Sequence, residues 1–89
     1  LRHEIAHGLF YTDPSYRRQA KRILSVLDLQ PIYKFLASSG YGKNVFLDEA
    51  HAYLGDDLEF FTRKGIDIAP YQDAHKQLAA LNRIYSARK

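Results

Sequence analysis

The sequence predicts an all-α protein, with five to six short helices packed as a small orthogonal bundle. Apolar residues recur at intervals of three and four along most of the chain, which is the pattern of amphipathic helices. Proline, glycine and capping residues separate these segments, and no segment alternates for long enough to predict a strand. With 89 residues, 46% of them hydrophobic, the chain can bury one modest core, so we expect a single domain over residues 1–89.

The first two predicted helices meet at a proline. The first runs from the N-terminus to about Tyr11, and Thr12-Asp13-Pro14 then offers a capping side chain followed by proline at an early helical position. We expect the second helix to run to about Leu29. Its apolar face comprises Tyr16, Ala20, Ile23, Leu24 and Leu27.

Glycines delimit the next helices. The third begins at Pro31 and stops at the turn 38–42, whose two glycines are free to take positive φ angles. Asn44 is a suitable N-cap for the fourth helix, which we expect to end near Leu54-Gly55. A short acidic helix then runs from Asp56 to about Lys64 and closes at a glycine.

The last predicted helix begins near Pro70, after an alternating stretch (66–68) that is too short to predict a strand. Its apolar positions are separated by three and four residues in turn, which predicts a seam that packs on the other helices. These positions are Tyr71, Ala74, Leu78, Leu81 and Tyr85.

Composition excludes several classes of protein. The chain has no Cys, which excludes disulfides and thiolate metal sites, and it has no apolar run long enough for a membrane span or a secretory signal. The net charge is only +3, and the one basic cluster of the sequence is typical of a solvated helix face. We therefore expect neither nucleic acid nor a membrane as a partner. That cluster comprises Arg17, Arg18, Lys21 and Arg22. The lack of Cys favours a cytoplasmic protein but also suits many secreted bacterial ones, which leaves the compartment open.

The motif that carries chemistry is His3-Glu4-Ile5-Ala6-His7, the pattern H-E-x-x-H. On a helix the two histidines lie about 40° apart in azimuth and one turn apart in height, so both imidazoles can face one metal ion. Glu4 lies about 60° from His7, where its carboxylate can reach water beside the metal without being a ligand. Ile5 and Leu9 are expected to form the core face behind them. The alternative is a surface helix with two unrelated histidines.

A catalytic zinc site needs a third protein ligand, and without Cys this must be His, Asp or Glu. The helix after Asn44 has its apolar face at Phe46, Ala50, Tyr53 and Leu54. Glu49 lies at the margin of this face and is our predicted third ligand, whereas Asp48 is expected to project away and His51 to flank the far edge. The alternative for Glu49 is an exposed acid paired with a lysine. The candidates weighed are Asp48, Glu49, His51 and Asp56.

The motif with Gly8, followed by the helix Asp48-Glu49-Ala50-His51-Ala52-Tyr53-Leu54, resembles the gluzincin type of zincin metallopeptidases. The resemblance covers these two helices, about a fifth of the chain, and Asp48 stands where several such families have asparagine. It implies peptide-bond hydrolysis with zinc (Zn²⁺) as cofactor and a peptide or protein as substrate. The implied roles are zinc ligands His3, His7 and Glu49, and general base Glu4.

The oxyanion formed during such a hydrolysis needs a hydrogen-bond donor. The candidates are Tyr53, His51, Tyr71 and His75. Tyr53 is favoured because it lies one turn past Glu49 on the same side, although a tyrosine in so small a domain can equally be a packing residue.

Zincin catalytic domains place a β-sheet before the motif helix, and this chain has no Met and begins two residues before His3. We therefore expect residues 1–11 to be a truncated active-site helix and residues 12–89 a helical subdomain. Together they would form the C-terminal helical part of a larger metallopeptidase-like domain, which alone would bind zinc weakly and cleave little. Two alternatives are a noncatalytic helical protein-interaction module derived from a zincin-like fold and a basic nucleic-acid-binding domain.

Overall fold

The computed structural model describes residues 2–87, and within them it is all-α, with no strand. This confirms the predicted fold class; residues 1, 88 and 89 of the predicted domain lie outside the described part. The helices are α1 (Arg2–Thr12), α2 (Pro14–Leu24), α3 (Gln30–Ser38), α4 (Phe46–Asp56), α5 (Leu58–Arg63) and α6 (Gln72–Ala87), with 3₁₀ turns η1 (Lys43–Val45) and η2 (Ala69–Tyr71).

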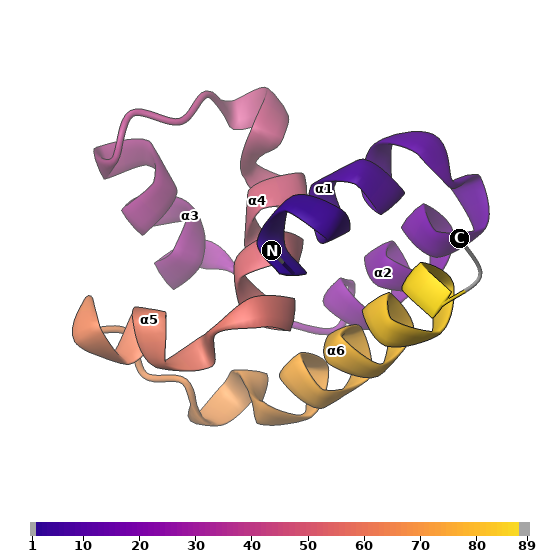
Figure 1. Ribbon diagram of the computed structural model, residues 1–89. Coiled ribbons are helices and arrows are strands. Elements are labelled where there is room, and N and C mark those ends of the chain that lie inside the picture. Colours follow the sequence, from indigo (N-terminus) through magenta and orange to yellow (C-terminus); the bar gives the residue numbers. More distant parts are fainter. Residues whose placement is uncertain (1, 88–89) are drawn as a thin grey trace.

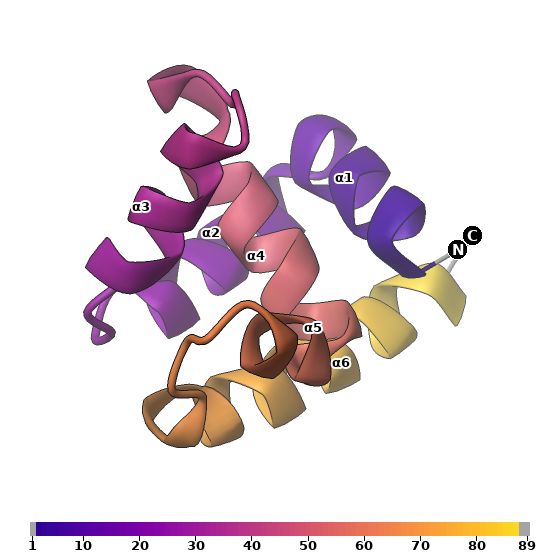
Figure 2. The same cartoon turned by 90° about the vertical axis from the view of Figure 1, so that its left-hand side faces the viewer.

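Helix α4 lies at the centre of the bundle. It packs against α1 on one side and α3 on the other, with α5 and α6 across its C-terminal end (Figures 1 and 2). Ala50, Ala52 and Leu54 of α4 are fully buried. Because two of these side chains are alanine, neighbouring helices can approach the α4 backbone closely. The acidic side chains of Asp48 and Glu49 on α4 are only 19% and 15% exposed.

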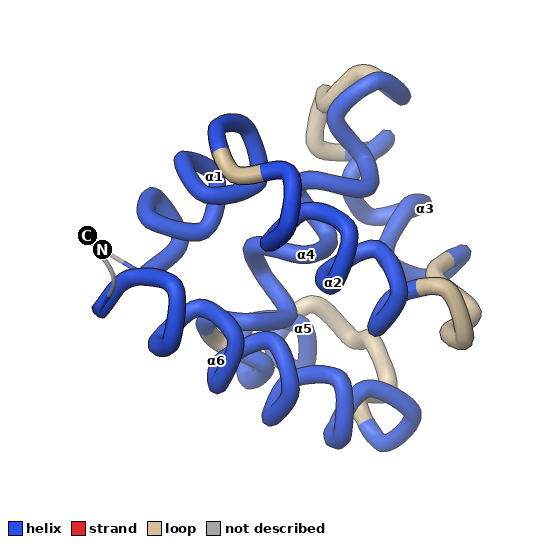
Figure 3. The backbone as a smooth tube through the Cα atoms, turned by 90° about the vertical axis from the view of Figure 1, so that its right-hand side faces the viewer, coloured by secondary structure: helices blue, strands red, loops and turns tan. Residues whose placement is uncertain are grey.

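Helices α2 and α6 lie beside each other on the face turned toward the viewer in Figure 3. Helix α1 begins next to the end of α6. Tyr16, Ala20 and Leu24 of α2 are buried in the common core. All five apolar positions predicted for the last helix are also buried, which confirms its seam. Tyr71 belongs to η2, and the other four belong to α6.

The predicted end of the second helix needs correction, whereas its start is confirmed. Asp13 caps α2 as expected, since its carboxylate accepts hydrogen bonds from the backbone N–H groups of Ser15 and Tyr16. The helix ends at Leu24, however, and not near Leu29. The chain then turns, and the Asp28 carboxylate accepts a hydrogen bond from the backbone N–H of Gln30. Gln30 is the first residue of α3, whose first turn contains a proline.

The prediction that Asn44 caps the fourth helix is wrong. Asn44 lies within the turn η1, and the residue at the N-cap of α4 is Val45, with no side-chain cap. The Asn44 side chain folds back over Gly42 instead, where a Cβ atom would lie only 2.8 Å from its Oδ1 atom. Of the two glycines in this turn, only Gly40 takes a positive φ, at 94°.

None of the helices within residues 2–87 is long and apolar enough to cross a membrane.

Tyr71 is a polar residue of the core with a backbone partner. Its ring is buried, and its hydroxyl donates a 2.6 Å hydrogen bond to the carbonyl oxygen of Asp28. Burial first, and then the nearby charges of Asp28 and Asp67, raise the pKa of the Tyr71 hydroxyl above its ordinary value.

We expect Tyr71 to make the fold sensitive to alkali. Because its pKa is higher in the folded than in the unfolded chain, its stabilisation is complete below about pH 10 and is lost as the pH rises further. Tyr71→Phe should lower the free energy of unfolding by about 1 kcal/mol at pH 8 and make it fall less between pH 9 and 11. Urea unfolding measures both effects. Tyr11→Phe, at a side chain that is 82% exposed, is the control; equal effects of the two substitutions would contradict this role.

Candidate metal centre

The first two turns of α1 and the first turn of α4 bring three ligand-type side chains together. His3 and His7 lie one helical turn apart, with their Nε2 atoms 3.0 Å from each other. The Glu49 carboxylate lies across from them: Oε1 is 3.5 Å from His3 Nε2, and Oε2 is 3.4 Å from His7 Nε2. The three residues predicted as metal ligands therefore form one cluster that could hold a metal ion.

These separations match the ligand spacing of a tetrahedral metal. Donor atoms about 2.0–2.2 Å from a zinc ion lie roughly 3.3–3.6 Å from one another. Both distances to Glu49 fall in this range, one measured to Oε1 and the other to Oε2, and the two histidine nitrogens would separate by a few tenths of an ångström. Glu49 Oε1 is also buried without a hydrogen bond, which is a costly state for a carboxylate oxygen. A cation at this point would satisfy it, so the donor set fits a divalent metal.

Asp48 does not project away from the cluster, as the sequence analysis expected. Its Oδ1 atom lies 3.0 Å from Nδ1 of His7 and 3.2 Å from Nδ1 of His51. A carboxylate behind a metal-ligating histidine fixes which ring nitrogen carries the proton and so which nitrogen faces the metal. The expectation failed because α1 covers more of α4 than its apolar residues alone indicate.

The expected place of His51, at the far edge of α4, is also wrong. The side chain is only 1% exposed and has a partner at each ring nitrogen. Nδ1 lies 2.8 Å from the backbone oxygen of Asp48, and Nε2 lies 2.8 Å from the hydroxyl of Tyr16. The ring of Phe10 stacks on the imidazole with centroids 4.6 Å apart.

The two histidines keep Asp48 ionised. Burial by itself would raise the pKa of this carboxyl, but the hydrogen bonds from His51 and His7, with the attraction of both rings, hold the pKa below its ordinary value. Asp48 is therefore a carboxylate at neutral pH and can only accept hydrogen bonds.

Tyr53 lies beside the candidate metal ligands. Its ring meets the His3 imidazole edge-on, with centroids 4.6 Å apart, and stacks on Phe60. Its hydroxyl lies 3.3 Å from that of Tyr41. Burial, then the neighbouring Tyr41 and Glu49, raise the pKa of Tyr53 well above its ordinary value, so the group remains a hydrogen-bond donor at neutral pH.

The other three candidates for an oxyanion donor are engaged elsewhere. The Tyr71 hydroxyl binds the Asp28 carbonyl, and His75 donates from Nδ1 to the carbonyl of Leu54 at 2.6 Å. His51 is held between Asp48 and Tyr16. Of the four candidates, Tyr53 alone has its ring against a predicted metal ligand.

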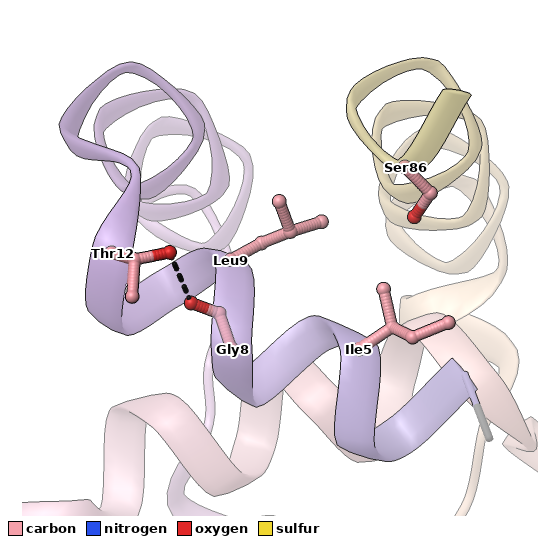
Figure 4. A pocket seen from close by; sticks show the side chains of 5 residues that line it. All are labelled: Ile5, Gly8, Leu9, Thr12 and Ser86. Atoms are coloured by element: carbon pink, nitrogen blue, oxygen red, sulfur yellow. Dashed lines mark hydrogen bonds between the residues drawn. The ribbon is translucent and has the colours of Figure 1, made fainter. Parts of the chain in front are cut away.

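The exposed side of α1 carries Glu4, the predicted general base, whose side chain lies at the surface. The predicted core face is only half right, because Leu9 is buried and Ile5 is 43% exposed. Ile5 and Leu9 instead border a pocket of about 400 Å³ between α1 and α6 (Figure 4). Gly8 faces the same space, since a Cβ there would meet nothing within 4 Å.

The sequence did not predict that Asp48, His51 and Tyr16 support the site. The spacing of Asp48 and His51, three residues apart on one helix, was a usable signal because i and i+3 side chains meet. No local signal marks Tyr16, which reaches His51 from α2 across 35 positions of sequence.

Comparison with known proteins finds no family model, no curated protein and no solved structure that matches the chain. Any assignment of function therefore depends on the chemistry of the described residues.

We expect zinc to stabilise the protein through this cluster. A ligand that binds only the folded state adds about 2.7 kcal/mol to the free energy of unfolding at a hundred times its Kd. Thermal unfolding with and without added Zn²⁺ should show the shift for the unaltered chain and little shift for Glu49→Ala. Glu59→Ala, which removes an exposed acid of α5, should keep the shift; equal shifts in both variants would refute the ligand set.

Proposed function

We propose that this protein is a zinc-dependent metallopeptidase of the zincin type, or the helical part of one. The observation that carries the proposal is the convergence of the His3 and His7 Nε2 atoms on the Glu49 carboxylate. The two histidines lie on α1, the helix that also presents Glu4 to solvent. The convergence joins residues 42 to 46 positions apart in the sequence, which the spacing of the motif alone does not produce.

The number of ligands supports a catalytic site over a structural one. Structural zinc sites have four protein ligands, whereas catalytic sites have three and an open position. The cluster contains two imidazoles and one carboxylate, which makes three ligands. Asp48 is not counted as a fourth, because its Oδ1 atom already contacts the Nδ1 atoms of His7 and His51. The ligand side chains of His3 and His7 also keep about a fifth of their surface exposed, at 22% and 23%.

When bound at these residues, zinc would supply Lewis acidity, which polarises a carbonyl group and makes nearby water more acidic. The Glu4 carboxylate would accept a proton from the attacking water as its oxygen bonds to the scissile carbonyl carbon. The same carboxyl would return that proton to the amide nitrogen as the C–N bond breaks. Tyr53 would donate its hydroxyl hydrogen toward the oxyanion that forms in between.

We expect Glu4→Gln to abolish hydrolysis and leave zinc binding intact, because the substitution removes the proton acceptor and touches no ligand. Cleavage of a library of internally quenched peptides is followed at high protein concentration, with zinc content measured in the same samples. Glu59→Gln is the matched control. Hydrolysis by Glu4→Gln at the unaltered rate would show the general base to be wrong. Stoichiometric zinc with no hydrolysis by any variant would favour a noncatalytic helical interaction module.

Tyr53→Phe tests the oxyanion donor. The hydroxyl hydrogen is lost while the ring that contacts His3 and Phe60 is kept, so the fold and the affinity for zinc should not change. Loss of one such donor lowers kcat by about 10²–10³, and KM should change far less. Tyr33→Phe, at another half-buried tyrosine, is the control. A fall in zinc affinity as large as the fall in kcat would argue that Tyr53 serves only to hold His3.

A further inference from the structure

We infer that Tyr16 and His51 are positioning residues that orient the metal-binding nitrogen of His7 from within the core, acting through Asp48. This rests on the proposed metal site and extends it to a chain of hydrogen bonds across three helices. The hydrogen-bond chain begins at Tyr16 of α2, passes through His51 and Asp48 of α4, and ends at His7 of α1.

The direction of each hydrogen bond follows from groups that can only accept. Nδ1 of His51 faces the backbone oxygen of Asp48 at 2.8 Å and its ionised carboxylate at 3.2 Å, so Nδ1 must carry the hydrogen. In the neutral ring Nε2 is then an acceptor, and the Tyr16 hydroxyl donates to it at 2.8 Å.

The same rule sets the other end of the chain. Nδ1 of His7 faces the Asp48 carboxylate at 3.0 Å and must donate to it. In the neutral ring the lone pair of His7 therefore lies on Nε2, which is the nitrogen that faces His3 and Glu49. His7 is held in the tautomer that a metal ion requires before any metal arrives.

Burial makes the chain rigid. His51 is enclosed between Phe10, which stacks on its ring, and Tyr16, whose ring meets it edge-on at 5.5 Å. The enclosed His51 ring holds the Asp48 carboxylate at 3.2 Å. We therefore expect Asp48 to keep the rotamer in which it contacts His7. An exposed aspartate alone would have several rotamers open to it.

The test measures the tautomer and the metal separately. In the metal-free protein, ¹⁵N chemical shifts of the histidine rings report which nitrogen of His7 carries the proton. We expect Nδ1–H in the unaltered chain and a mixture of tautomers in Tyr16→Phe, His51→Leu and Asp48→Asn. Zinc affinity, measured by competition with a chromophoric chelator, should fall about tenfold to a hundredfold in the last two and less in Tyr16→Phe.

Two further variants separate positioning from general stability. His51→Asn keeps a donor near the place of Nδ1 and should recover part of both effects relative to His51→Leu. Tyr33→Phe removes a hydroxyl away from the chain and should change neither. Tyr16→Phe deletes a single oxygen, so it keeps the test decisive if His51→Leu does not fold.

Each combination of results supports or overturns the inference. A change of tautomer together with weaker zinc binding supports it. Weaker binding with the His7 tautomer unchanged overturns it, since the loss then comes from general destabilisation, and a changed tautomer with unchanged affinity overturns the role in metal binding. If the unaltered protein binds no zinc, the proposed function fails. The His7 tautomer in the variants then decides by itself whether Tyr16, His51 and Asp48 orient His7.

Discussion

The packing of α1 against α4 is the interaction on which the rest of the structure depends. Ala6 of α1 and Ala50 of α4 are buried, and the two helices pack against each other. Alanine side chains let the two backbones approach closely, and that approach carries the imidazoles of α1 to within 3.5 Å of the Glu49 carboxylate. Apolar burial thus sets the geometry of a polar site.

The same contact concentrates charge and proton donors in a small volume. Two carboxylates of α4, Asp48 and Glu49, meet two imidazoles of α1, and all four side chains are partly shielded from water. Asp48 is satisfied by hydrogen bonds from two histidines, whereas Glu49 has an oxygen with none. Adjacent residues on one helix therefore differ: Asp48 is already hydrogen-bonded to two rings, and Glu49 keeps an oxygen that could hold a cation.

The remaining helices support this pair from behind. Helix α2 brings the Tyr16 hydroxyl to the buried ring of His51. Ser15 of α2 also meets Tyr85 of α6 through their hydroxyls, 2.7 Å apart. A polar chain inside a core is stable only when each member has a partner, so these contacts make the position of the site depend on the whole bundle.

The sequence by itself determined what local geometry controls. The spacing of His3 and His7 places both imidazoles on one side of a helix because residues four apart are neighbours there, and Asp13 with Pro14 begins α2 for equally local reasons. The apolar seam of the last helix was predicted residue by residue, since a period of 3.6 marks a buried face. The choice of Glu49 also came from this kind of reasoning, as a residue at the margin of an apolar face.

Only the tertiary structure decided which polar side chains of α4 belong to the site. Asp48 and His51 were expected to point elsewhere, because the apolar face of α4 shows where its core lies and not how far a neighbouring helix overlaps its edge. That overlap depends on the volumes of side chains on both helices and on the angle at which they cross, which no single segment contains. Tyr16 joins the site for the same reason, since its hydroxyl reaches His51 only after α2 has packed against α1 and α6.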